Sequence, residues 1–240
     1  MHRPKLGFDV MSFHHSDHVM NFPHTDDVTL FRGKASTNRK EFNLAILWYT
    51  SRYRRYLVGV YFFEDLEDFV PVIALPPNVA EPPKQLFEII TERELDDAYR
   101  MVCLRCGACC EFCAGGFVFD HEVPIVGSEY VDRENFEDVE IPFVGRVRVY
   151  ALRNVKGRCR AFDAVSRTCM VHDRKPIACL IMYCGLVAEK RGSIYVYTCR
   201  GSGCRYVAWE GSLEVLRAKV RSLIKSIALR ECRALRGWMR

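Results

Sequence analysis

The chain has 240 residues, of which 49% are hydrophobic and 27% are charged, and its formal net charge is +5 at pH 7. This composition is typical of an ordered globular protein and excludes an intrinsically disordered chain. The modest positive charge is no evidence of a nucleic-acid partner by itself, and no apolar run approaches the roughly 18 residues of a membrane span.

The first segment, residues 1–40, shows little hydrophobic periodicity, and we expect it to be loosely ordered. His14 and His18 would share one face of a helix and could meet a metal ion there. The flanking residues carry no helical pattern, so we favour a solvated polar segment. Because no apolar leader follows the first residue, we expect a cytoplasmic, soluble protein without a membrane anchor.

Residues 41–98 are interpreted as a β-containing N-terminal part with a linker and an entry helix. Apolar and aromatic runs predict short strands joined by polar connections. The predicted strands are Leu44–Thr50, Tyr56–Phe63 and Phe69–Leu75. A proline-rich linker follows, and Thr91 with Glu94 fits a capping box that starts a helix over 92–102.

The remaining elements lie within and after a cysteine-rich region at 99–205. The acidic stretch 120–140 predicts a solvated helix face or loop, whereas Phe143–Tyr150 and Ser193–Tyr197 predict strands that brace the cysteine-bearing loops. In the C-terminal segment, 206–240, apolar residues recur at three and four positions from Ser212 to Trp238. This spacing predicts an amphipathic packing helix. Its basic face is interpreted as solvated, with a phosphate- or partner-contacting helix as the alternative. The expected fold class is α+β.

Eleven of the twelve cysteines lie between positions 103 and 204, and only Cys232 lies outside. In a reducing compartment, clustered thiols are expected to bind a soft metal or an iron–sulfur core rather than to form disulfides. The cysteines at 103–113 reproduce the C-x2-C-x2-C-x3-C spacing of bacterial ferredoxins. Ala114 stands where those proteins have proline, however, and the second run that a two-cluster ferredoxin needs is absent. Gly107 lets the backbone bend closely around a bound centre.

The run Cys-Leu-Arg-Cys-Gly-Ala-Cys-Cys at 103–110 resembles the opening motif of the zinc- or iron-chelating cysteine-cluster family (CxxCxxCC domain, YkgJ-type iron–sulfur cluster-containing proteins). The resemblance continues at 157–163, 168–179 and 199–203. It implies a metal or iron–sulfur centre in a loop-rich domain. The ligand set that it implies is Cys103, Cys106, Cys109, Cys110, Cys159, Cys169, Cys179 and Cys199.

The chain departs from the family pattern at several positions. His172 stands in place of the usual Tyr and is either a ligand, a partner of one, or purely structural. Lys175 separates Arg174 from Pro176, and Arg174 is interpreted as a local structural residue. Three further cysteines could be ligands or spare thiols, and a fourth is expected to be a buried apolar side chain. These are Cys113, Cys184 and Cys204, and then Cys232.

Three hypotheses about function remain open from the sequence. The preferred one is an iron–sulfur protein, with an expected [4Fe–4S] cluster, that serves electron transfer or redox chemistry with an unidentified redox or protein partner. The adjacent Cys109 and Cys110 favour it over zinc, since structural zinc sites more often show two separate C-x2-C pairs. The alternative is a structural zinc module with a nucleic-acid or protein partner. The third hypothesis is an enzyme, such as an iron–sulfur oxidoreductase, whose substrate site lies between the N-terminal sheet and the cysteine region. No known nucleotide-binding or nucleophile motif identifies its reaction.

Overall fold

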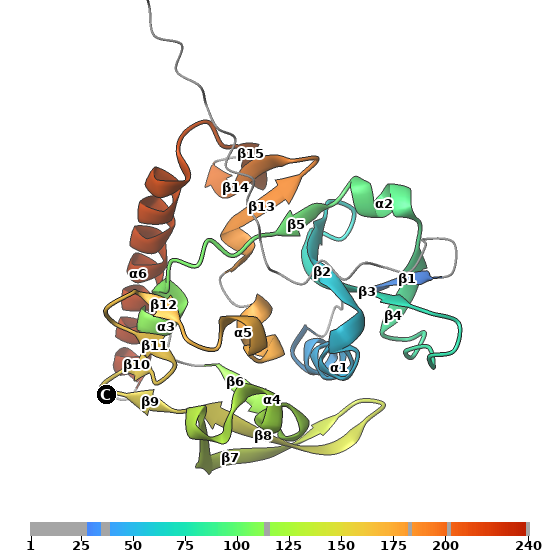
Figure 1. The fold of residues 1–240 in the computed structure, drawn as a ribbon, viewed down its shortest axis with the longest axis horizontal. Coiled ribbons are helices and arrows are strands. Elements are labelled where there is room, and N and C mark those ends of the chain that lie inside the picture. Colours follow the sequence, from blue (N-terminus) through green and yellow to red (C-terminus); the bar gives the residue numbers. More distant parts are fainter. Residues whose placement is uncertain (1–27, 35–38, 113–115, 182–183, 201–202, 239–240) are drawn as a thin grey trace, which may run out of the picture.

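A computed structural model gives the fold and describes residues 28–34, 39–112, 116–181, 184–200 and 203–238 (Figure 1). The architecture is α+β, as predicted. Within the described residues, the largest unit is an antiparallel eight-stranded sheet of order β15-β14-β13-β5-β2-β3-β1-β4. Its strands are β1 (Thr29–Gly33), β2 (Leu57–Phe63), β3 (Asp68–Leu75), β4 (Phe87–Ile90), β5 (Tyr99–Met101), β13 (Val187–Lys190), β14 (Ser193–Arg200) and β15 (Gly203–Ala208).

Strand β5 joins the two halves of this sheet. On one side Arg100 lies opposite Tyr61 of β2, and on the other side Met101 lies opposite Ala188 of β13. The N-terminal strands and the last strands of the cysteine region therefore share one sheet. This pairing also fixes where the chain enters the first cysteine motif, two residues after β5 ends.

A smaller antiparallel sheet of order β6-β8-β7 and two short hairpins complete the β structure of the described residues. The strands of the small sheet are β6 (Phe117–Phe119), β7 (Val131–Ile141) and β8 (Gly145–Leu152). The hairpins pair β9 (Asn154–Val155) with β10 (Arg158–Cys159), and β11 (Phe162–Asp163) with β12 (Thr168–Cys169). Two of the predicted ligand cysteines thus end short strands.

Helices cover the flanks of these sheets. They are α1 (Arg39–Arg52), α2 (Glu92–Asp96), α3 (Ala108–Phe112), α4 (Val123–Val126), α5 (Ile177–Ile181) and α6 (Leu213–Trp238), with 3-10 turns η2 (Arg54–Tyr56), η3 (Asp120–Glu122), η4 (Ser128–Tyr130), η5 (His172–Arg174) and η6 (Cys184–Leu186). The long α6 runs along one side of the molecule with α3 against it (Figure 1). One buried core joins α1 to β1, β3, β6 and β7 through residues such as Ile46, Phe31, Ile73, Phe119 and Ile141.

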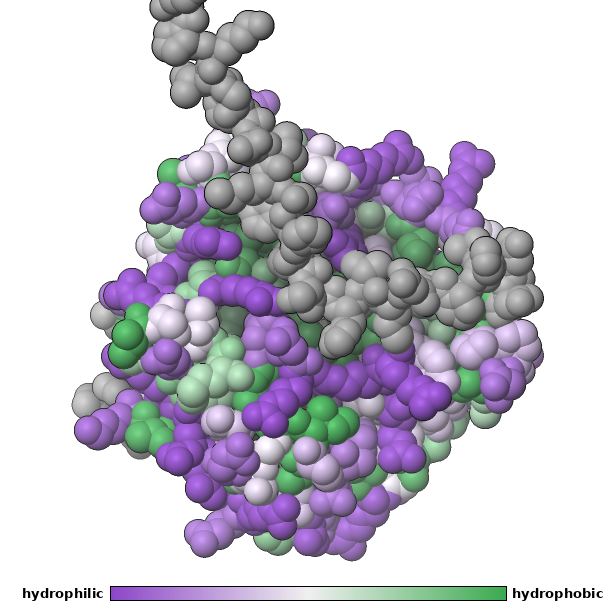
Figure 2. All heavy atoms as spheres, viewed as in Figure 1, coloured by the Kyte–Doolittle hydropathy of each residue, from purple (hydrophilic) through white to green (hydrophobic). Residues whose placement is uncertain are grey.

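The surface is mixed in character. The face drawn in Figure 2 carries mostly hydrophilic side chains, with hydrophobic ones scattered among them. In the part of the chain that the structure describes, no helix combines the length and the apolar character needed to cross a membrane.

The strand predicted over Leu44–Thr50 is wrong, because these residues lie in α1. A short apolar run cannot be assigned to strand or helix by periodicity alone. In the helix, Ala45, Ile46 and Leu47 are buried. The hydroxyls that follow are satisfied locally, since Thr50 donates to the Ile46 carbonyl and Ser51 to the Trp48 carbonyl, each at 2.7 Å.

The entry helix is shorter than predicted. The capping box of Thr91 and Glu94 is present, but α2 ends at Asp96 and strand β5 follows. The backbone of β5 bonds to strands on both sides, so tertiary pairing overrides the local helical pattern. The structure confirms the C-terminal helix and the predicted strands at 56–63, 69–75, 143–150 and 193–197. Each observed end lies within three residues of the predicted one, and the largest difference is at the end of β14, which extends to Arg200.

Two other segments also differ from expectation. Residues 131–140 of the acidic stretch lie in strand β7 instead of a helix face or loop, and most side chains of this strand are exposed. Residues 29–33, placed in the loosely ordered N-terminal segment, form β1 between β3 and β4. His14 and His18 lie outside the described residues.

Candidate metal centre

The first cysteine motif is pressed against the β11–β12 hairpin at Gly107. This residue has a φ of +67°, and a Cβ placed on it would overlap the carbonyl oxygen of Arg167 and lie 2.8 Å from the Phe162 ring. Only glycine fits both the backbone conformation and the space. The close approach brings the 103–110 loop to the hairpin that carries Cys169.

Helix α6 holds the same loop from the other side. Arg221 donates from Nη1 to the Cys106 carbonyl at 2.5 Å and pairs with Glu111 of α3. One turn earlier, Arg217 donates from Nε to the Leu104 carbonyl at 3.1 Å. The predicted basic face of α6 is therefore not solvated throughout, because two of its arginines donate hydrogen bonds to backbone carbonyl groups of the loop.

Three cysteines from separate segments meet behind this loop. The Cys110 thiol of α3 lies within hydrogen-bonding range of the sulfurs of Cys159, at the end of β10, and Cys169, at the end of β12. Cys103 lies close enough to Cys169 for charge on one to oppose charge on the other. The fold thus gathers Cys103, Cys110, Cys159 and Cys169, which we call the thiol cluster.

Backbone amides support two of these sulfurs. The Ala161 N–H bonds to the Cys159 sulfur, and the Val171 N–H bonds to the Cys169 sulfur, each two residues further along the chain. The two segments are tied together because the Met170 amide donates to the Ala161 carbonyl at 2.8 Å. Such N–H···S bonds orient a thiolate and stabilise its charge.

The thiols are electrostatically unlike one another. Hydrogen bonding from Cys110 lowers the pKa of Cys159 and, with help from the Lys175 ammonium, lowers the pKa of Cys169 to about 7. The pKa of Cys110 is raised, first because it is the donor to Cys159 and then to Cys169. Two sulfurs are therefore disposed to become thiolates, the form that binds soft metals.

The surroundings of this group are apolar. Cys159 is 7% exposed and shares a buried core with Val118, Val131, Ala161 and Val171. Cys110, Cys169 and Cys179 pack partly buried against the same core. A Cβ placed on Gly116 would lie 2.8 Å from the Cys179 sulfur, so the chain passes directly over that thiol. Burial of this kind strengthens charge interactions and limits access of water.

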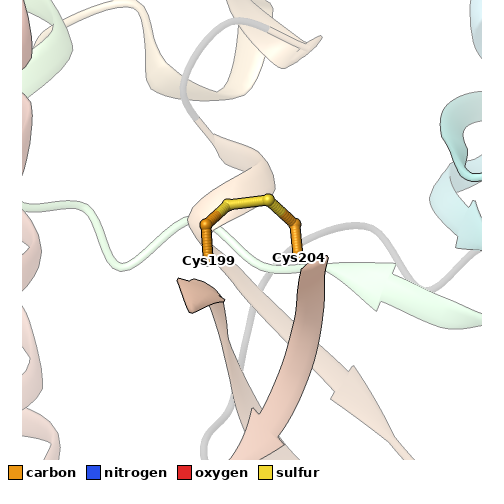
Figure 3. The surroundings of a disulfide bond; sticks show 2 residues. All are labelled: Cys199 and Cys204. Carbon is orange, nitrogen blue, oxygen red and sulfur yellow. A yellow bond between two sulfur atoms is a disulfide. The ribbon is translucent and has the colours of Figure 1, made fainter. Parts of the chain in front are cut away.

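The other predicted ligands are placed differently. Cys106 and Cys109 pack partly buried against the apolar cluster under α6 that contains Leu216 and Val220. Cys199 is joined to Cys204 by a disulfide across the β14–β15 hairpin (Figure 3), with an S–S distance of 1.96 Å. The two residues lie directly opposite in the register, which brings their sulfurs together. The expectation that these thiols stay unpaired, with Cys199 as a ligand, therefore needs correction.

The additional candidates are only partly described. Cys113 lies outside the described residues, as do the side chains of Cys184 and Cys232. His172 is half-buried in η5, and the Arg174 guanidinium lies 5.9 Å from the centre of the Tyr130 ring, consistent with a structural role. Lys175, noted in the sequence only as an insertion, is 7% exposed, and its positive charge helps to lower the pKa of Cys169.

The chemistry of the donors fits a thiophilic metal. Soft sulfur ligands, N–H···S bonds and an apolar surround are what zinc or an iron–sulfur core requires. Cys103, Cys110, Cys159 and Cys169 would hold such a group, with Cys179 beside them. Within the described residues, no set of three or more His, Cys, Asp or Glu side chains has the spacing of an assembled ion site. Instead, the Cys110 thiol forms hydrogen bonds with Cys159 and Cys169.

Comparison with known families agrees with this geometry. Residues 102–200 match the model of the CxxCxxCC family, whose description reads "Putative zinc- or iron-chelating domain". The chain carries a CxxCxxCC domain. Comparisons with curated proteins and with solved structures give no significant match. The CxxCxxCC match supports the binding of zinc or iron by the region in which the thiols converge.

Proposed function

We propose that the CxxCxxCC domain holds an iron–sulfur cluster of the [4Fe–4S] type and that the protein acts in electron transfer or redox chemistry. The observation that carries the proposal is the contact of the Cys110 thiol with both Cys159 and Cys169. Cys103, whose charge would act on that of Cys169, would supply the fourth sulfur. Four thiolates are the usual ligand complement of such a cluster.

The chain's own residues would set the properties of that centre. When bound, the cluster would supply reversible one-electron chemistry. The amides of Ala161 and Val171 hold charge on two ligand sulfurs, and Lys175 supplies a buried positive charge. Hydrogen bonds and nearby cations favour the more negative, reduced state. The apolar core around Cys159 excludes water from one side.

Zinc is the second candidate, because four converging thiols also match a tetrahedral structural site. In that case the metal would complete the fold, and the protein would act through a nucleic-acid or protein partner. Cys179, which packs on the same core as Cys110 and Cys169, does not separate the two candidates, because one zinc ion and one [4Fe–4S] cluster each take four protein ligands.

The test is metal and sulfide analysis of the full chain purified without oxygen. Stoichiometric iron, acid-labile sulfide and visible absorption that bleaches on reduction are expected, and Cys110→Ala should lose them. Cys232→Ala is the matched control, because it alters the cysteine outside the motif region, and it should keep them. Colourless protein with stoichiometric zinc would replace the cluster by the structural site, and absence of both metals would overturn metal binding.

A further inference from the structure

A cavity of about 680 Å³ opens beside the thiol cluster, and Cys159 forms part of its wall. It lies between the β9–β10 hairpin, the β11–β12 hairpin and η4. Its volume is in the range of about 300–1,000 Å³ that small-molecule sites occupy. Since the Cys159 sulfur also hydrogen-bonds with Cys110, a molecule in this cavity would adjoin the thiol cluster.

The cavity has a positive lining. Lys156, Arg158 and Arg160 contribute to it, against the single carboxylate of Glu129. Arg158 also lies 3.8 Å from Glu111, measured between Nη2 and Oε1. Lys156 and Arg160 make no ion pair with any residue that the structure describes. An anion in the cavity would therefore meet two cations, Lys156 and Arg160, that form no ion pair with a described carboxylate.

The turn geometry holds two of these cations on one short hairpin. Lys156 and Gly157 have φ values of 52° and 78° and connect β9 to β10 as a two-residue turn. Positive φ at both positions is typical of a type I′ turn, whose twist matches that of the flanking strands. Lys156 and Arg158 consequently project from a fixed backbone next to the buried Cys159.

The other walls are apolar and include side chains that the fold leaves exposed. Val155, Phe162 and Met170 line the cavity, and Met170 is 53% and Val155 44% exposed. An aromatic ring or aliphatic group would cover them, and Met sulfur packs favourably against aromatic rings. The cavity thus pairs an apolar wall with a cationic rim.

We propose that this cavity binds a small organic anion that carries a phosphate or carboxylate next to an aromatic or other apolar group. The anionic group is held by Lys156 and Arg160, and the apolar group lies against Phe162 and Met170. Binding requires these side chains and no metal.

Phenyl phosphate is a suitable probe, because it combines both features. Isothermal titration of the full chain should show saturable one-to-one binding that weakens as salt is added. Inorganic phosphate and phenol, which each carry one feature, should bind more weakly. Absence of saturable phenyl phosphate binding at low salt would overturn the proposal, as would equal affinity for inorganic phosphate.

Charge reversal locates the site. The double variant Lys156→Glu/Arg160→Glu should lose about tenfold or more in affinity, because two attractive charges become repulsive. Arg93→Glu is the matched control, since Arg93 is exposed on α2 and does not line the cavity. Near-UV circular dichroism verifies that both variants fold, and unchanged affinity in the double variant would refute the site.

Metal content measured on the same samples separates this proposal from the function proposed above. Protein with full metal content but no phenyl phosphate binding refutes the anion site alone. Protein without metal that still binds phenyl phosphate through Lys156 and Arg160 supports the anion site and refutes the metal function alone.

Discussion

The carboxylate of Glu122 accepts a hydrogen bond at 2.9 Å from the backbone nitrogen of Ile177, the first residue of α5. Its second oxygen accepts from the Phe119 amide at 3.3 Å, and the Arg54 Nη1 lies 3.8 Å from Oε1. Glu122 has no exposed surface. Helix α5 carries Cys179, so this single carboxylate ties one of the thiol-bearing elements to β6 and to the segment after α1.

Replacing Glu122 by alanine should lower the free energy of unfolding by about 2–4 kcal/mol. The change leaves the Ile177 amide without its acceptor and removes the charge opposite Arg54, both in a buried setting where unpaired groups are costly. Urea unfolding followed by circular dichroism measures the effect. Glu137→Ala on the exposed face of β7 is the control and should change stability by less than about 0.5 kcal/mol. A loss no larger than the control's would contradict this role.

Gly107 should tolerate no side chain, and a second glycine provides the comparison. Gly107 and Gly192 have similar φ values of +67° and +76°, but a Cβ on Gly192 meets nothing within 4 Å. Gly192→Ala should therefore cost only the left-handed backbone strain, about 1–2 kcal/mol. Gly107→Ala adds a clash with the Arg167 carbonyl and the Phe162 ring, so the loop must move away from the β11–β12 hairpin.

The expected result is a larger loss of stability in Gly107→Ala than in Gly192→Ala, together with lower metal content in Gly107→Ala only. Thermal unfolding and elemental analysis of the two purified variants provide the measurements. Equal losses of stability with equal metal content would show that the contact at Gly107 does not position the cysteine loop.

Several elements could be predicted from the sequence because the local pattern and the final environment agree. The apolar spacing of Leu216, Val220 and Ile224 indicates one buried helix face, and all three are buried in α6. Likewise, the Thr91–Glu94 capping box forms as its spacing predicts. These interactions are local, so neighbouring residues are enough to specify them.

The rest depends on contacts that no local pattern encodes. The apolar run of α1 fits a strand as well as a helix, and only packing against β1 and β3 decides. The spacing of the cysteines identifies a chelating region, but it does not tell that Cys110 meets Cys159 and Cys169 while Cys106 and Cys109 pack toward α6. Glu122 and Arg54 carry no motif, because their importance arises from burial beside α5.

His121 should make the protein less stable as the pH falls below neutrality. Burial, and next the charge of Arg52, lower the pKa of His121 from 6.5 to about 4. The Ser51 hydroxyl donates to the Trp48 carbonyl, so its oxygen accepts from the His121 Nε2 at 2.7 Å, and protonation would fall on Nδ1. The His121 ring is also stacked on Phe119.

The sign follows from linkage. Between pH 6.5 and pH 4 the unfolded chain binds a proton at this histidine and the folded chain does not, so stability is lost as the pH decreases. Because the ring is only partly buried, the loss should be about 1–2 kcal/mol. His121→Gln keeps a donor toward Ser51 without titrating. Urea unfolding at pH 7 and pH 5 should show a smaller decrease for the variant, and equal decreases would contradict the assignment.

Cys199 and Cys110 separate the family's cysteine pattern from the arrangement in this fold. Both belong to the eight cysteines that the family resemblance implies as ligands. Cys110 contacts two other sulfurs of the thiol cluster, whereas Cys199 forms a disulfide with Cys204. We expect Cys110→Ala to lose metal and Cys199→Ala to retain it. The disulfide should be visible in wild-type protein as a peptide pair that gains about 2 Da on reduction, since each S–S bond takes up two hydrogens. Elemental analysis of both variants, with Cys232→Ala as the reference, decides the question. Loss of metal in Cys199→Ala would place Cys199 among the ligands and require the Cys199–Cys204 bond to open before the metal binds.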